Sequence, residues 1–77
     1  MASMAYFKKM RENETSIFYA YGPDSDDMTS ELIFDKESGQ PTVDAADLGY
    51  TGRKAAGKIL ALVRERGEWP EKGASVS

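Results

Sequence analysis

TSIFYAY, residues 15–21, reads as a strand that is apolar on both faces, and the rest of the predicted sheet is built around it. Aromatic and β-branched residues favour strands, and successive side chains of a strand point to opposite faces of the sheet. Phe18 and Ala20 share one face, whereas Ile17, Tyr19 and Tyr21 share the other. The strand therefore has apolar surface to bury on both sides.

Neighbouring stretches extend this strand into an antiparallel sheet. Residues 4–10 (MAYFKKM) and 29–35 (TSELIFD) also read as strands. The polar residues 11–14 suit a hairpin loop, and the Gly-Pro and acidic residues of 22–27 suit a turn. QPTV, residues 40–43, predicts a short fourth strand at an edge or a strand end, because its proline has no amide proton to donate.

The spacing of apolar residues changes from that of a strand to that of a helix at residue 51. At about 100° per residue, one arc of the helix collects the apolar side chains, which are Ala55, Ala56, Ile59, Leu60, Leu62 and Val63. Thr51 suits the N-cap, and Gly67 suits the C′ position after the last turn. The pattern predicts a helix over about residues 52–66, with one extra turn within residues 43–50.

These elements predict one small α+β domain over residues 1–77. Its sheet is antiparallel with three to four strands, and one C-terminal helix packs on one face. A hydrophobic content of 40% is enough for a core. Residues 1–3 and 71–77 are expected to fray.

The composition argues against enzyme, cofactor and metal functions. The 77 residues include neither histidine nor cysteine, which are the side chains that most readily titrate or attack near neutral pH. The acidic run DSDD, residues 24–27, departs from the calcium-loop order, because Met28 and Thr29 stand where an oxygen ligand and a glycine are required. We expect a non-enzymatic protein without cofactor or metal.

The sequence also gives an expectation for location. No apolar run approaches the roughly 18 residues that cross a bilayer, and residues 1–10 lack the order of a signal peptide. We expect a cytoplasmic protein that does not enter membranes.

A single helix covers only one face of a small sheet, so the other face is predicted to meet a protein partner or a second copy of the chain. Phenylalanine has no polar end, which predicts Phe7, Phe18, Leu32 and Phe34 beneath the helix. The predicted partner-binding residues on the other face are Tyr6, Ile17, Tyr19, Tyr21 and Ile33. As an alternative, the tail from Trp69 onward folds back over that face.

A second candidate site is GYTGRKAAGK, residues 49–58. It follows the phosphate-loop order G-x-x-x-x-G-K but then has Ile59, where Ser or Thr must reach magnesium. The amides at the helix start and the nearby cations instead suggest an anion site, formed by Gly49, Thr51, Gly52, Arg53, Lys54 and Lys58.

Two resemblances bear on nucleic-acid binding. Residues 49–52 (GYTG) resemble in outline the GXXG loop with which KH domains clamp a nucleic-acid backbone. The order of three strands and a helix resembles integrase arm-binding domains, which read DNA through the sheet. Residues 51–66 carry a net charge of +4 and the rest of the chain −7, so the predicted sheet is acidic and repels phosphate. Nucleic acid is therefore the less favoured partner.

Overall fold

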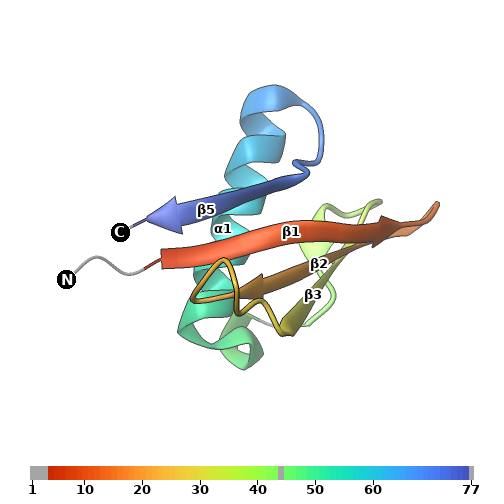
Figure 1. Ribbon diagram of the computed structural model, residues 1–77. Coiled ribbons are helices and arrows are strands. Elements are labelled where there is room, and N and C mark those ends of the chain that lie inside the picture. The colour runs from red at the N-terminus through yellow and green to blue at the C-terminus, as the bar shows by residue number, and fades with distance from the viewer. Residues whose placement is uncertain (1–3, 44, 77) are drawn as a thin grey trace.

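The computed structural model of the protein describes residues 4–43 and 45–76. The elements follow in the order β1 (Met4–Glu12), β2 (Ser16–Gly22), β3 (Ser30–Asp35), β4 (Gln40–Pro41), α1 (Ala45–Arg66) and β5 (Lys72–Val76). The strands form one antiparallel sheet in the order β4-β3-β2-β1-β5. α1 lies behind this sheet in Figure 1, and the opposite side, which faces the viewer, is called the outer face below. The predicted α+β fold is confirmed, with one strand more than predicted.

β5 is the additional strand and corrects the prediction that residues 71–77 fray. Lys72–Val76 pairs with β1, so that Ala74 lies opposite Tyr6. Its sequence KGASV has a single β-branched residue, and its partner strand lies more than 60 positions away, so no local pattern reveals it. The segment widens the sheet instead of folding back over the outer face. Residues 1–3 and 77 lie outside the described residues.

An extra residue in β1 decides which side chains of the hairpin face the helix. The register pairs Lys9 with Tyr19 but then Arg11 with Phe18, so the residue between Lys9 and Arg11 forms a β-bulge. Side chains alternate with a period of two, so one extra residue inverts the faces beyond it. A regular hairpin would place Phe7 on the face of Phe18, whereas the bulge places Phe7 on the face of Tyr19.

The predicted faces of β2 are therefore wrong. Ile17, Tyr19 and Tyr21 were predicted on the outer face and are buried on the α1 side. Phe18 was predicted beneath the helix and lies half-buried on the outer face. Tyr6 lies half-buried on the outer face.

Tyr19 lies at the centre of the core. It is fully buried, and its ring makes edge contacts with Phe7 (centroids 5.8 Å apart, 80° between planes) and with Phe34 (5.9 Å, 88°). Its hydroxyl donates a hydrogen bond to the Pro70 carbonyl oxygen at 2.6 Å. Trp69 packs on Phe34 with centroids 5.2 Å apart. Because the hydroxyl is paired, burying a tyrosine here leaves no unsatisfied polar atom.

The titration of Tyr19 gives a testable prediction. Burial raises the pKa of Tyr19 above its ordinary value, and the charges of Glu12 and Glu71 add to this shift. The raised folded-state pKa means that the stabilisation is complete below the unfolded pKa of about 10 and is lost as the pH rises above it. We expect the urea midpoint to fall as the pH rises from about 10 to about 12, and to fall less in Tyr19→Phe.

The same variant loses the hydrogen bond to Pro70, so we expect it to be less stable than the wild type by about 1 kcal/mol at neutral pH. Tyr6→Phe is the matched control on the outer face and should keep the wild-type dependence on pH. Equal alkaline slopes for the wild type and Tyr19→Phe would contradict the assignment to Tyr19.

The helix is broken at Gly49, whose φ of 73° and ψ of −178° fall in a region that only glycine adopts readily. Residues 45–48 form the predicted extra turn, and the main segment begins just before Thr51. Gly67, with a φ of 76°, donates its amide to the Val63 carbonyl at 2.8 Å, which confirms the predicted C′ position. Among the described residues, no helix is long and apolar enough to cross a membrane.

Candidate functional site

The outer face carries half-buried apolar side chains. Among the described residues, no helix packs on this face as α1 packs on the other. Four strands contribute to it, with Tyr6 from β1, Phe18 from β2, Ile33 from β3 and Ala74 from β5. Of the five residues predicted to bind a partner, the structure leaves only Tyr6 and Ile33 on this face. Phe18 takes the place that the prediction gave to the residues now in the core.

A groove of about 440 Å³ lies on the outer face between β1, β5 and the loop of residues 23–29. The strands contribute Tyr6, Lys8, Lys72 and Ala74 to its lining, and the loop contributes Ser25 and Met28. Most of the lining surface is apolar. A concave apolar surface with a few polar groups at its rim is typical of binding sites. Met28 is unbranched and adapts to ligands of different shape.

The loop of residues 23–29 crosses the outer face because Gly22 has no side chain. A Cβ at Gly22 would lie 1.7 Å from the backbone oxygen of Asp27. The loop is itself a tight turn, in which the Asp27 amide donates to the Asp24 carbonyl at 3.0 Å and the Asp26 amide donates to the Asp24 carboxylate at 3.3 Å. The loop is therefore ordered by its own hydrogen bonds and lines one side of the groove.

Opposite charges lie on the two sides of this groove. Lys8 and Lys72 are exposed and lie opposite each other in the register of β1 and β5. On the loop side, Asp24, Asp26 and Asp27 are exposed. Within residues 4–43 and 45–76, none of these five side chains makes an ion pair. The charges are thus available to a partner.

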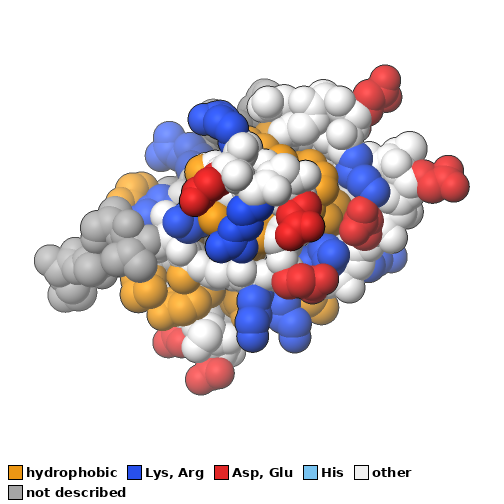
Figure 2. All heavy atoms as spheres, turned by 90° about the horizontal axis from the view of Figure 1, so that it is seen from above, with side chains coloured by type: hydrophobic (Ala, Val, Ile, Leu, Met, Phe, Trp, Pro, Cys, Tyr) orange, Lys and Arg blue, Asp and Glu red, His pale blue; other side chains and the backbone are white. Residues whose placement is uncertain are grey.

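Figure 2 looks down on the edge formed by β5, so its lower margin is the outer face. Hydrophobic side chains are exposed along this margin beside lysine or arginine side chains, and acidic side chains project at its lowest point. Apolar, basic and acidic side chains therefore lie close together on this margin.

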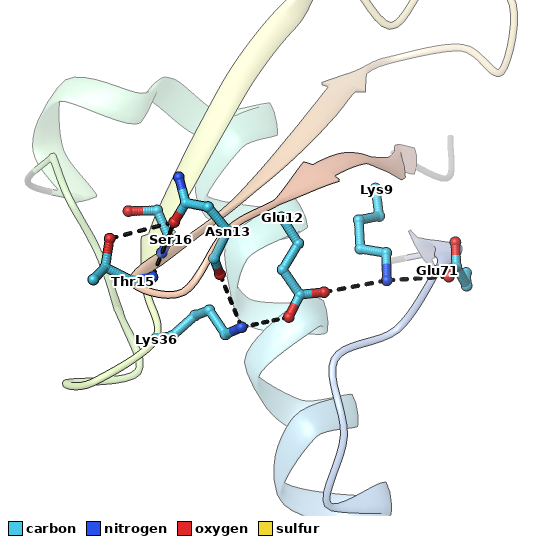
Figure 3. Close-up of polar contacts among 7 residues, drawn as sticks. All are labelled: Lys9, Glu12, Asn13, Thr15, Ser16, Lys36 and Glu71. Carbon is cyan, nitrogen blue, oxygen red and sulfur yellow. Dashed lines mark hydrogen bonds and ion pairs between the residues drawn. The ribbon is translucent and has the colours of Figure 1, made fainter.

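A separate polar cluster lies at the far end of the sheet (Figure 3). Lys9 lies between two carboxylates, with its Nζ 3.1 Å from Glu71 Oε1 and 3.5 Å from Glu12 Oε1. Lys36 pairs with Glu12 and donates to the Asn13 carbonyl at 3.0 Å. The cluster ties the β1–β2 turn to the β3–β4 turn and to the segment before β5, so we assign it a structural role.

The charges of this cluster hold each other in their ionised forms. The hydrogen bond from Lys36 lowers the pKa of the Glu12 carboxyl, and the hydrogen bond to Glu71 raises the pKa of the Lys9 ammonium. The stabilisation by Glu12 is present above its ordinary pKa and is lost as the pH falls through the lowered value. The raised pKa keeps the Lys9 amine protonated near neutral pH, whereas a nucleophilic lysine must be uncharged.

The residues of the alternative anion site lie at the start of the main helical segment. Arg53 Nε donates back to the Gly49 carbonyl at 3.3 Å, and the Lys54 ammonium lies 5.4 Å from the centroid of the Tyr50 ring. Gly52 is buried, and a Cβ there would lie 2.9 Å from the Tyr21 hydroxyl. A shallow cavity of about 290 Å³ runs from β4 along α1 past Arg53. Thr51 and Lys58 are half-buried.

Sequence reasoning missed the loop and β5 as parts of the groove. Ser25 and Met28 read as turn residues, and Lys72 and Ala74 read as part of a frayed tail. The local signal is Gly22, which predicts a turn and also permits the close approach of two backbone segments. Among the described residues, no acidic side chains gather as a metal site would require.

Comparisons with protein-family models, with curated proteins and with solved structures find no match to this chain, so its function is inferred from its own geometry.

Proposed function

We propose that this chain is a non-enzymatic protein-binding module that docks its partner on the outer face of the sheet. One observation carries this proposal: the face opposite α1 holds a mostly apolar groove whose charged rim has no ion-pair partner among the described residues. Protein interfaces typically combine an apolar, aromatic centre with a polar rim. Tyr6 supplies the aromatic group at the groove, and Phe18 and Ile33 continue the apolar surface across the sheet.

The Arg11 guanidinium supports the reading of the outer face as a binding surface. It lies 4.1 Å from the centroid of the Phe18 ring, on the same face as the groove. Tyrosine and arginine are the residue types that carry most binding energy at protein interfaces. The cation–π contact stabilises the Phe18 ring in this position.

The experiment that tests this proposal compares two tyrosine variants. Tyr6→Ala removes the aromatic group of the groove, whereas Tyr50→Ala removes an exposed tyrosine from α1 (58% exposed) and serves as the matched control. Proteins captured from native cells by the wild type and by Tyr50→Ala should be the same. Tyr6→Ala should retain at least one of them about tenfold less, because truncating a central aromatic anchor costs 1–2 kcal/mol or more, in rough terms.

Both variants must show wild-type thermal unfolding to within a few degrees, so that loss of capture reports binding and not unfolding. Identical capture by all three proteins, or capture of nothing by the wild type, would contradict the proposal. The alternative anion or nucleic-acid site is tested separately, by amide chemical shifts during titration with short DNA and RNA at low salt. Shifts confined to residues 49–58 would favour that alternative.

A further inference from the structure

The strands that line the groove carry positive charges, and the loop beside it carries negative charges. A second copy of the same surface can place opposite charges against both. The strand side of the groove carries the two unpaired lysines, Lys8 and Lys72. The loop lines the groove with Ser25 and Met28, and its neighbouring residues Asp24, Asp26 and Asp27 are exposed. The apolar lining lies between them. An acidic peptide would be repelled by the loop, and a basic peptide would be repelled by the lysines.

A second copy of the chain avoids both repulsions if it is related to the first by a two-fold axis that lies in the interface and runs along the groove. A symmetric dimer uses the same patch on both subunits, so each feature must face its complement on the other copy. Rotation about this axis brings the basic side of one copy opposite the acidic side of the other, twice. The apolar residues Tyr6 and Met28 then face their counterparts near the axis.

We propose that the occupant of the groove is a second copy of this chain, docked so that the acidic loop of each copy lies against Lys8 and Lys72 of the other. This inference rests on the proposed function and names the partner of the same site. The preformed turn of residues 24–27 is well suited to this role, because a loop that is already ordered loses little entropy on docking.

A charge-swap experiment tests the arrangement directly. The groove variant carries Lys8→Glu and Lys72→Glu, and the loop variant carries Asp26→Lys and Asp27→Lys, which keep the Asp24 carboxylate that closes the turn. Sedimentation of the wild type from about 10 µM to about 1 mM should show a mass rising toward twice that of the monomer, as expected for an interface at the small end of the range. Each variant alone should raise the dimer dissociation constant by about tenfold or more, because like charges then face each other.

An equimolar mixture of the two variants should associate again. In that heterodimer the glutamates of one copy face the lysines introduced in the loop of the other, and the native aspartates face the native lysines. The control carries Lys58→Glu and Arg64→Glu on α1, which changes the net charge by the same amount as the groove variant and should leave association unchanged. Near-ultraviolet circular dichroism confirms that every variant is folded.

Three outcomes would overturn the inference: a wild type that stays monomeric over the whole range, variants that associate as the wild type does, or a mixture that stays monomeric. The proposed function is judged separately. If the wild type is monomeric but Tyr6→Ala still loses a captured protein, the outer face binds a different protein and only the second copy is excluded. If capture is also unchanged, both proposals fail.

Discussion

Replacing Phe34 by alanine is expected to leave most of the protein unfolded at room temperature. Phe34 is fully buried and contacts both the Tyr19 and the Trp69 rings. Removing a buried phenylalanine costs about 3–5 kcal/mol. A core of this size supplies only about 3–5 kcal/mol in total, so a single such cavity consumes most of the stability. Far-ultraviolet circular dichroism with urea titration measures the loss.

Phe18→Ala is the matched control for Phe34→Ala. The two rings lie on opposite faces of the sheet, and Phe18 is only half-buried beside Arg11. We expect Phe18→Ala to cost about 1 kcal/mol, mainly through the lost contact with the guanidinium and some lost burial. A Phe18→Ala variant as unstable as Phe34→Ala would contradict the faces that the bulge assigns to the side chains.

Replacing Gly22 by alanine is expected to give the second large effect. The new Cβ would lie 1.7 Å from the Asp27 oxygen and 2.9 Å from the Met28 Cα, and both are backbone atoms that no side-chain rotation can move. Forcing extra volume into a closed site costs about 1–3 kcal/mol, and more where the backbone must move. The melting temperature should therefore fall by roughly 5–20 °C, and the loop should withdraw from the groove.

Gly57→Ala is the matched control and should act in the opposite direction. Gly57 lies within α1, and a Cβ there would meet nothing within 4 Å beyond its own turn of helix. Alanine in an exposed helix position is up to about 1 kcal/mol more stable than glycine. If Gly22→Ala left the melting temperature unchanged, the loop would not cross the outer face as described.

Most elements of the fold were predictable from local patterns. Alternating apolar residues revealed the first three strands, and the 100° periodicity with Gly67 at its end revealed the helix. The bulge between Lys9 and Arg11 was not predictable, because the sequence KKMR pairs equally well in either register. The faces of β2 were predicted wrongly for a second reason, because the tyrosine hydroxyl was expected to need solvent, whereas that of Tyr19 is paired with the Pro70 carbonyl inside the core.

The site was less predictable than the fold because it is assembled from distant segments. Tyr6 could be named from its strand, but the groove exists only where the β2–β3 loop crosses β1 and where β5 joins the sheet. Both depend on tertiary contacts, such as the approach of Asp27 to Gly22, which leave no periodic pattern. The sequence alone does not show that Lys8 and Lys72 lie beside each other, because this depends on the pairing of β1 with β5.

The position of β5 beside β1 has a consequence for the order in which the protein matures on the ribosome. β1 is synthesised first and pairs early with β2, which is its neighbour in sequence, but its second edge waits for Lys72–Val76. Pairing between strands that are far apart in the sequence is slow, because the entropy of loop closure is lost before the stabilising contacts form. During this interval the edge of β1 stays open to other nascent chains. Chaperone dependence and aggregation should therefore be most sensitive to changes in Lys72–Val76, the segment that closes this edge.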